Sequence, residues 1–244
     1  RSFLKSKKTK FKIVSVVEGV IMVLCAFFCA PATSNLVAYS LTSQSSGDFS
    51  DYFIKPQVIA STPKPKNIIY FYLESLEGNY MDESLFPGLL PELHKIEKDS
   101  VTFTNIGQTI GSSWTMAGMV SSQCGMPLLS VFTNDNFQMN NFMPNAVCLG
   151  DILKSKGYHL EFMGGAETEF AGKGQFYKDH GFSDVKGKKE FVDQHVAKDY
   201  INNWGLYDDT LYEQLLTRVA SLRQTQTPWG LFSINIGTHQ PEGY

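Results

Sequence analysis

The sequence predicts an α/β fold in which helices flank a mostly parallel sheet, and three features indicate this class. The run Ile68–Leu73 is apolar or aromatic at every position, which is typical of a strand buried on both faces of a parallel sheet. A second strand-like run, Tyr158–Met163, follows directly on a helix-like segment that Gly157 closes. A third, Trp229–Ile236, also follows a helix-like segment, so helices and strands alternate along this part of the chain.

Length and charge limit the class of protein. The 244 residues suffice for one large domain with an appendage, and a hydrophobic content of 43% supplies a core. A formal net charge of −3 gives no sign of nucleic-acid binding. We divide the chain into a basic flank with an apolar segment (1–30), a linker (31–66) and a domain (67–244). Because the chain starts at Arg1 and ends at Tyr244 just after a strand-like run, we expect a fragment of a longer protein.

The first part of the chain has the pattern of a membrane anchor. Basic residues between Arg1 and Lys12 precede the apolar run Ile13–Ala30, which predicts a transmembrane helix with its N-terminal side in the cytoplasm. Glu18 lies inside that run, and Ala30–Ala32 resembles a signal-peptidase site, so a cleaved signal peptide is the alternative. Both interpretations place the rest of the chain on the outer face of the membrane.

The domain begins after a polar linker that closes with Ser61–Lys66. Its first predicted strand, Ile68–Leu73, is followed by Glu74. Ligands gather beyond the carboxyl ends of strands in open α/β sheets, which makes Glu74 a candidate metal ligand. The alternative is a carboxylate that caps the following turn.

Next along the chain, Pro91–Lys98 predicts a helix with Leu89, Leu90, Leu93 and Ile96 on one side, and Val101–Asn105 predicts a short alternating strand.

The segment Gly111–Pro127 contains the candidate nucleophile. A small-residue turn leads to Thr115 and then to apolar residues spaced three to four apart, as at the start of a helix. Free N–H groups at a helix start favour an anion, so Thr115 is well placed to attack phosphorus or to bind a metal. The alternative is that Ser112, Ser113 or Thr115 only caps a buried helix. Trp114, beside the nucleophile, either stacks on a substrate or packs in the core.

The last third of the chain predicts more of the sheet. Asp151–Lys156 reads as a helix, and a longer helix with Leu211, Leu215 and Leu222 on its buried face follows Asp208 and Asp209, either of which can cap it. The final strand runs into Thr238 and His239. Because parallel strands end at a common edge, we expect Glu74, Thr115 and His239 to form one site.

Cysteines and the other histidines leave several questions open. No CxxC motif occurs, and Cys124 and Cys148 either form a disulfide or remain as buried thiols. We expect His94 at the surface and His159 in the core or at an edge. His180 and His195 have no evident partner in the sequence.

Four sequence pieces carry a resemblance to a known family: NIIYFYLESLE, GSSWTMAGMVSSQCGMPLL, FMGGAETEFAGKGQFYKDHGF and SINIGTHQPEGY. In this order and spacing, the chain from about Asn67 to Tyr244 resembles the alkaline-phosphatase/sulfatase superfamily. Within it, the chain is similar to the membrane phosphoglycerol transferases, which include enzymes that modify periplasmic glucans and the lipoteichoic acid synthases. The C-x-P-x-R motif of sulfatases is missing, which argues against hydrolysis of sulfate esters through formylglycine.

The resemblance implies a metal ion, usually Mn²⁺, with Mg²⁺ or Zn²⁺ as alternatives. Glu74 and Thr115 match two of its ligands, and an Asp-His pair that completes the set would lie beyond Tyr244. The match implies that His239 contacts the phosphoglycerol head group and that Lys173 lies toward the phosphate. Ala171 stands where lipoteichoic acid synthases carry tryptophan, so head-group contacts differ there. With only part of the ligand set, we expect this chain alone to bind metal weakly.

The implied activity is transfer of glycerol phosphate from phosphatidylglycerol to a periplasmic glucan through a phosphothreonine at Thr115. The implied location is the bacterial inner membrane, with the domain on the periplasmic or extracellular side. Three alternatives stay open: a lipoteichoic acid synthase-like enzyme, a phosphoethanolamine transferase or related hydrolase, and a membrane-tethered binding domain without activity.

Overall fold

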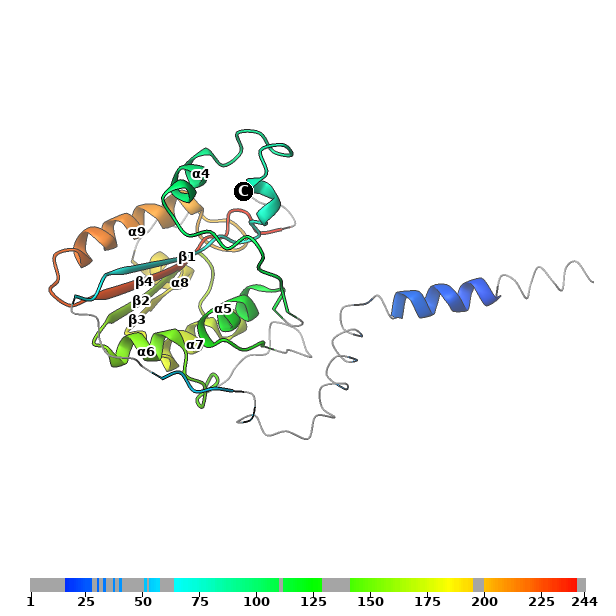
Figure 1. Cartoon of the computed structure of the whole chain (residues 1–244), viewed down its shortest axis with the longest axis horizontal. Helices are drawn as coiled ribbons and strands as arrows, with labels where there is room; N and C mark the ends of the chain where they lie inside the picture. Colours follow the sequence, from blue (N-terminus) through cyan, green and yellow to red (C-terminus); the bar gives the residue numbers. More distant parts are fainter. Residues whose placement is uncertain are drawn as a thin grey trace, which may run out of the picture.

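A four-stranded parallel sheet lies at the centre of the domain (Figure 1). The computed structural model describes residues 16–27, 30, 33, 37, 40, 51, 53–57, 64–109, 112–128, 141–194 and 200–240. Its strands are β1 (Ile68–Tyr72), β2 (His159–Gly164), β3 (Asp184–Lys186) and β4 (Trp229–Ile234), arranged in the order β1-β4-β2-β3. Tyr72 of β1 and Gly164 of β2 both pair with Ile234, so these three strands end at one edge of the sheet. The predicted parallel α/β fold is confirmed for the described residues.

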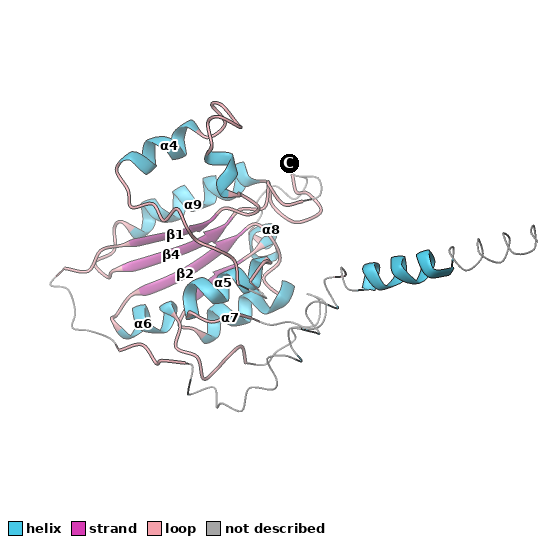
Figure 2. Cartoon of the chain, turned by 45° about the vertical axis from the view of Figure 1, so that its right-hand side comes forward, coloured by secondary structure: helices cyan, strands magenta, loops and turns pink. Residues whose placement is uncertain are grey.

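Helices cover both faces of this sheet (Figure 2). The helical elements are η1 (Gly78–Met81), α4 (Pro91–Lys98), α5 (Thr115–Cys124), α6 (Leu149–Ser155), η3 (Phe170–Gly172), α7 (Lys173–Asp179), α8 (Lys188–Asp193) and α9 (Asp208–Leu222). Helices α5, α6 and α7 lie on one face, and α8 and α9 lie on the other (Figures 1 and 2).

Two hydrophobic cores follow from the alternation of side chains along the strands. On β2, Phe162 belongs to the core under α5–α7, whereas the adjacent Met163 belongs to the core under α8 and α9. On β4, Phe232 and Leu231 divide in the same way. These central strands are apolar on both faces because both faces are covered.

Helix α5 is anchored at both ends. Met116, Ala117, Met119 and Val120 are buried, and the helix ends at Gly125, whose φ of 68° is a left-handed C-cap conformation. A disulfide joins Cys124, the last residue of α5, to Cys148, the N-cap residue of α6. Of the two alternatives for these cysteines, the disulfide is therefore the one observed.

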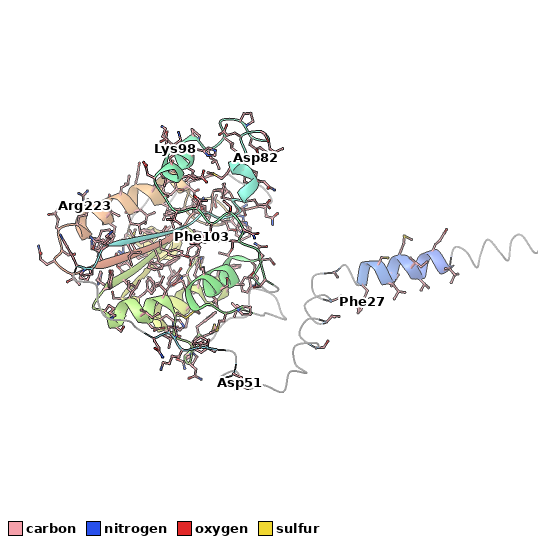
Figure 3. The ribbon with its side chains drawn as sticks, viewed as in Figure 1. Phe27, Asp51, Asp82, Lys98, Phe103 and Arg223 are labelled. Atoms are coloured by element: carbon pink, nitrogen blue, oxygen red, sulfur yellow. A yellow bond between two sulfur atoms is a disulfide. The ribbon has the colours of Figure 1, made fainter. Side chains whose placement is uncertain are left out.

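Two expectations from the sequence are wrong, the strand at Val101–Asn105 and the burial of β1 on both faces. Val101–Asn105 is not a strand, and Phe103 within it is 76% exposed (Figure 3). Strand β1 is at the edge of the sheet instead of being buried on both faces, and its Ile69 is 60% exposed. Helix α4 forms as expected but buries none of its residues, and Ile96 is 62% exposed. The common cause is that, within the described part of the chain, no further element packs against this edge.

Residues 16–27 form a helix at the N-terminal side of the chain. Among the described residues, no helix has both the length and the apolar character needed to cross a membrane. The predicted span Ile13–Ala30 extends over residues outside the described set, so the transmembrane helix stays a prediction.

Candidate active site

Glu74 and Thr115, which are far apart in sequence, are in direct contact. Glu74 lies two residues beyond the end of β1, and Thr115 is the first residue of α5. The Thr115 hydroxyl donates a hydrogen bond to Glu74 Oε2 at 3.0 Å. A hydroxyl at a helix start thus meets a carboxylate at the carboxyl edge of the sheet, as we expected from the two sequence segments.

Thr115 is not the cap of its helix. The N-cap residue is Trp114, whose backbone is extended and whose side chain makes no capping hydrogen bond. The Ser112 hydroxyl donates instead to the Thr109 carbonyl at 2.8 Å. The Thr115 hydroxyl is directed at Glu74 and remains close to the first free N–H groups of α5.

Side chains from β1 and α7 fix the far end of the same helix. The Gln123 amide donates to the hydroxyls of Tyr72 on β1 at 3.0 Å and Tyr177 on α7 at 3.2 Å. Burial raises the pKa of both tyrosines, so both hydroxyls stay protonated at neutral pH. Together with the disulfide, this network sets where α5 lies and therefore where Thr115 lies.

Strand β4 holds the backbone of Glu74. The Glu74 N–H donates to Asn235 Oδ1 at 2.8 Å, and its carbonyl accepts a hydrogen bond from the Thr238 hydroxyl. Ser75 has a φ of 55°, an uncommon conformation for a residue other than glycine, and its hydroxyl donates to Glu74 Oε1 at 3.3 Å. The segment after β4 therefore holds the Glu74 backbone, and Ser75 and Thr115 hold its carboxylate.

Asp208 organises this edge from the start of α9. Its Oδ1 accepts the backbone N–H groups of Ile236 at 3.0 Å and Gly237 at 2.9 Å, and its Oδ2 accepts from the Asn235 amide at 2.9 Å. We expected Asp208 or Asp209 to cap α9, but Tyr207 is the N-cap residue and makes no side-chain capping bond. The roles of Asp208 and Asn235 in positioning Glu74 were missed, although both stand at element ends, where polar residues signal such contacts.

Lys173 is a buried cation near Glu74. It begins α7, directly after Ala171 and Gly172, whose φ values of 55° and 72° produce a left-handed turn. The residue is only 4% exposed, and burial lowers the pKa of its ammonium group to about 8, although Glu74 and Glu167 act in the opposite direction. The structure therefore places a partly desolvated positive charge within electrostatic range of Glu74, which is the environment an anionic group requires.

His239 and Trp114 border the site without touching its centre. The imidazole of His239 lies against the indole of Trp204, with ring centroids 4.1 Å apart and planes tilted by 37°. Within the described residues no hydrogen bond joins His239 to Glu74 or Thr115, and the link is through the adjacent Thr238. Trp114 is half-buried and packs against the core beneath α5–α7, and its stacking on a substrate stays a prediction.

The geometry of Glu74 and Thr115 fits two ligands of one octahedral ion. Neighbouring oxygens around such an ion are separated by about 3 Å, and Glu74 Oε2 and Thr115 Oγ1 are 3.0 Å apart. Hard oxygen ligands suit Mn²⁺ or Mg²⁺. Across the described residues, Glu74 belongs to no group of three ligating side chains. Weak metal binding by this chain alone therefore stays a prediction.

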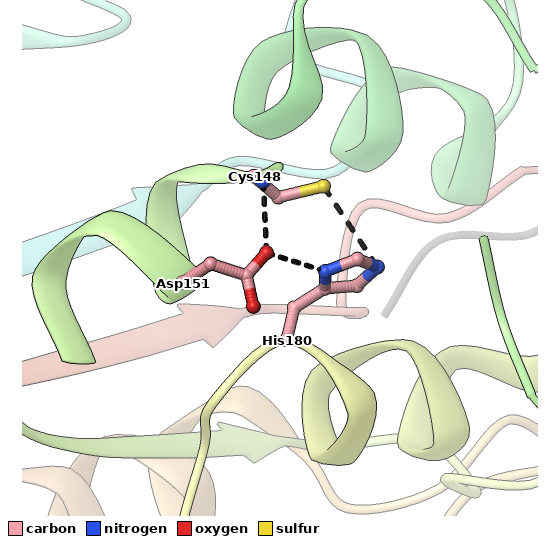
Figure 4. Close-up of side chains that lie close together, drawn as sticks. All are labelled: Cys148, Asp151 and His180. Atoms are coloured by element: carbon pink, nitrogen blue, oxygen red, sulfur yellow. Dashed lines mark hydrogen bonds and ion pairs between the residues drawn. The ribbon is translucent and has the colours of Figure 1, made fainter. Parts of the chain in front are cut away.

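The one such group found among the described residues is Cys148, Asp151 and His180 (Figure 4). Its sulfur is part of the disulfide and so offers no thiolate. His180, for which we had foreseen no partner, is buried and pairs with Asp151 at 2.7 Å.

Two other histidines also pair with carboxylates. His94 is only partly exposed and lies 3.0 Å from Glu83, and His159 is 2.5 Å from Glu161. His195 is outside the described residues.

Known proteins are similar in sequence to this chain over most of its length. Residues 66–244 match the family model described as Sulfatase. The chain is 42% identical over 183 residues to phosphoglycerol transferase I of Xanthomonas euvesicatoria, a match that covers 74% of this chain and 26% of that protein. It is 40% identical over 207 residues to phosphoglycerol transferase I of Escherichia fergusonii, covering 84% of this chain and 27% of that protein. The chain thus spans about a quarter of the length of these relatives.

Solved structures share the fold. A protein of the alkaline phosphatase superfamily from Vibrio parahaemolyticus superposes with a TM-score of 0.60 at 21% identity, covering 75% of this chain and 43% of that one. The lipoteichoic acid synthase LtaP from Listeria monocytogenes superposes with a TM-score of 0.57 at 18% identity, covering 72% and 41%.

Proposed function

The chain belongs to the sulfatase family, and we propose that it forms part of a phosphoglycerol transferase that uses Thr115 as its nucleophile. The donor is phosphatidylglycerol and the acceptor is a hydroxyl group of a glucan or another polyol. The contact between the Thr115 hydroxyl and Glu74 carries this proposal, because it joins a candidate nucleophile to a group that accepts its proton. The relatives named phosphoglycerol transferase I support the choice of reaction.

In the first step, Thr115 Oγ1 attacks the phosphorus of phosphatidylglycerol and its proton moves toward Glu74 Oε2. The bond from phosphorus to the diacylglycerol oxygen breaks, and that oxygen takes up a proton, which leaves glycerol phosphate on Thr115. In the second step, an acceptor hydroxyl attacks the same phosphorus, the bond from phosphorus to Thr115 Oγ1 breaks, and the proton of the acceptor hydroxyl passes to Thr115 Oγ1. A divalent cation held by Glu74 and Thr115, Mn²⁺ by preference, would supply charge neutralisation and ease deprotonation of the hydroxyl.

Other residues have binding roles in this proposal. Lys173 neutralises phosphate charge in a buried setting where each charge interaction is strong. His239, supported by Trp204, contacts the glycerol head group, and Trp114 lines the approach to Thr115. Glu74, the partner of the nucleophile, is held by Asn235, and Asp208 holds the backbone just after β4.

A lipid donor agrees with attachment to a membrane. The basic residues before Ile13 and the apolar run that follows support a membrane anchor with the domain on the periplasmic or extracellular side of the bacterial inner membrane. An anchored enzyme meets a lipid substrate at the membrane surface, where the donor is concentrated.

The test uses the full-length protein in detergent with Mn²⁺ and fluorescent phosphatidylglycerol, and follows release of labelled diacylglycerol. We expect Thr115→Ala to reduce release by at least about a thousandfold, and Thr115→Ser to retain measurable activity. Ser121→Ala is the matched control, because the Ser121 hydroxyl is on the same helix but bonds to the Gly118 carbonyl. Wild-type activity in Thr115→Ala would contradict the assigned nucleophile.

Product analysis tests the reaction itself. Glycerol phosphate attached to a glucan supports the proposed transferase, and chains of glycerol phosphate would indicate a lipoteichoic acid synthase-like activity. No release by the folded, metal-loaded protein would favour another head group, such as phosphoethanolamine, or a binding domain without activity.

A further inference from the structure

Cys148, which forms a disulfide with Cys124, lies beside the buried His180 and its partner Asp151, which the proposed reaction does not use (Figure 4). Cys148 Sγ is 3.8 Å from His180 Nε2, and His180 Nδ1 is 2.7 Å from Asp151 Oδ2. His180 is only 2% exposed and Cys148 is fully buried. The residues come from three places in the chain: the end of α5, the start of α6 and the end of α7.

We propose that this cluster is a redox-controlled metal site. When the disulfide is reduced, the thiolates of Cys124 and Cys148 and the Nε2 atom of His180 bind one divalent ion of the zinc type. Asp151 holds the imidazole in place through Nδ1, and water fills the fourth position. Disulfide and metal exclude each other, since both use the same two sulfur atoms.

The separation between Cys148 and His180 already suits tetrahedral zinc. A thiolate and an imidazole on one zinc ion are about 3.6 Å apart, from bond lengths of about 2.3 and 2.0 Å. The observed separation between Cys148 Sγ and His180 Nε2 is 3.8 Å. In the disulfide form Nε2 also lies 3.1 Å from the Phe142 carbonyl, a bond that it would exchange for the metal.

Asp151 has the role that carboxylates have behind zinc-bound histidines. A histidine that ligates a metal usually donates its other ring N–H to a carboxylate, which fixes its orientation. Asp151 Oδ2 is held in turn by the Cys148 backbone N–H at 2.8 Å. The Asp151 side chain is 32% exposed, whereas that of His180 is 2% exposed.

The metal preference of the site follows from its ligands. In the reduced form, two thiolates on one zinc ion lie about 3.7 Å apart. Two sulfurs and one imidazole select Zn²⁺ or Co²⁺ over Mn²⁺ and Mg²⁺. The cluster therefore prefers different metal ions from those that the oxygen ligands Glu74 and Thr115 prefer.

The redox chemistry needs a two-electron reductant. A phosphine and water convert the disulfide to two thiols and a phosphine oxide, and a dithiol achieves the same by exchange. Each thiol releases its proton when it binds the ion. A small-molecule disulfide, itself reduced to two thiols, reforms the protein disulfide by exchange and expels the metal.

Cobalt titration tests the site in the full chain. The protein is reduced with a phosphine, the reductant is removed without air, and Co²⁺ is added while thiolate-to-cobalt charge-transfer absorption is followed. We expect one equivalent of Co²⁺ to produce this absorption in the reduced protein, and Zn²⁺ to abolish it. The oxidised protein should show none. Oxygen ligands give no such band, so cobalt bound at Glu74 and Thr115 does not interfere, and Thr115→Ala should leave the signal unchanged.

Variants locate the ligands. We expect Cys148→Ser to abolish the band and His180→Gln to weaken Co²⁺ binding by more than about tenfold, with a smaller loss for Asp151→Asn. His94→Gln is the matched control, because His94 also pairs with carboxylates but lies away from the cysteines. The proposal is wrong if reduced, folded wild-type protein gives no band, or if neither His180→Gln nor Asp151→Asn changes the affinity.

Discussion

At the scale of single residues, the fold changes the pKa of Lys173, a buried lysine near the candidate site. Burial lowers the pKa of its ammonium group to about 8, so the folded protein loses this proton at a lower pH than the unfolded chain. Between pH 8 and the ordinary lysine pKa, the unfolded chain binds more protons, and stability rises with pH. The expected rise from this group is up to about 3 kcal/mol.

We predict that Lys173→Met increases the free energy of unfolding at pH 7 and removes this rise between pH 8 and 10. Urea unfolding at several pH values, in metal-free buffer, measures both effects. Lys178→Met is the control, because Lys178 is on the same helix but exposed and should leave the pH dependence as in wild type. The same substitution at Lys173 should weaken transfer from phosphatidylglycerol, since the phosphate loses a positive partner. Equal pH slopes for wild type and Lys173→Met would contradict the buried charge.

Local sequence patterns predict part of the candidate site. Glu74 and Thr115 follow from local patterns, a carboxylate after an apolar strand and a hydroxyl at a helix start, and the fold brings them to 3.0 Å. Asp208 and Asn235 do not follow from local pattern. Their hydrogen bonds connect segments that become neighbours only when α9 and β4 meet. His180 was missed for the same reason, because its partner Asp151 belongs to another helix.

At the scale of elements, close packing depends on a glycine in α6. A Cβ atom added at Gly150 would lie 2.2 Å from the His180 carbonyl oxygen and 2.7 Å from the Phe182 ring. We predict that Gly150→Ala destabilises the protein by about 1–3 kcal/mol, because α6 must move away from the end of α7. Denaturant unfolding measures the loss.

Gly118 in α5 provides the opposite case. It is helical, and the nearest atom to an added Cβ is the Ser112 carbonyl oxygen at 3.9 Å. Gly118→Ala should therefore leave stability unchanged or raise it by up to about 1 kcal/mol, as expected for a helix interior. Equal changes in unfolding free energy for Gly150→Ala and Gly118→Ala would contradict the close contact at Gly150.

Elements with long, regular patterns were predictable and short ones were not. β2, β4 and α9 were expected close to their observed bounds, because each has a clear apolar pattern. β3 has three residues and α8 has six, too few for a period to appear, and they form because they pack against β2 and the core. The strand expected at Val101–Asn105 has suitable residues, but no strand among the described residues bonds with it.

At the scale of the whole molecule, the apolar surface is uneven. Several large apolar side chains are exposed: Ile69, Leu89, Ile96, Val101, Phe103 and Ile106. The two faces of the sheet are by contrast well covered by α5–α7 and by α8 and α9. The apolar pattern of the sequence predicts where strands form. The burial of a given strand depends on its position in the sheet, which the pattern alone does not specify.

The disulfide is the covalent link between distant parts of this molecule. It connects Cys124 and Cys148, 24 residues apart, across a stretch that includes residues outside the described set. Closing a loop of this size restricts the unfolded chain, which corresponds to about 3–4 kcal/mol of stability. We predict that the double variant Cys124→Ala, Cys148→Ala loses an amount of this order.

Urea unfolding of the oxidised wild type and the double variant, both with a metal chelator, measures the loss without interference from bound metal. Cys25→Ala is the control, because Cys25 is exposed and free and its replacement should leave the unfolding free energy unchanged. The double variant also separates the effect of the disulfide on stability from its effect on the position of Thr115. If Gln123 and the buried face of α5 suffice to place Thr115, the folded variant retains transferase activity in the full-length protein at low temperature. A folded variant without activity would mean that the covalent link itself sets the position of the nucleophile.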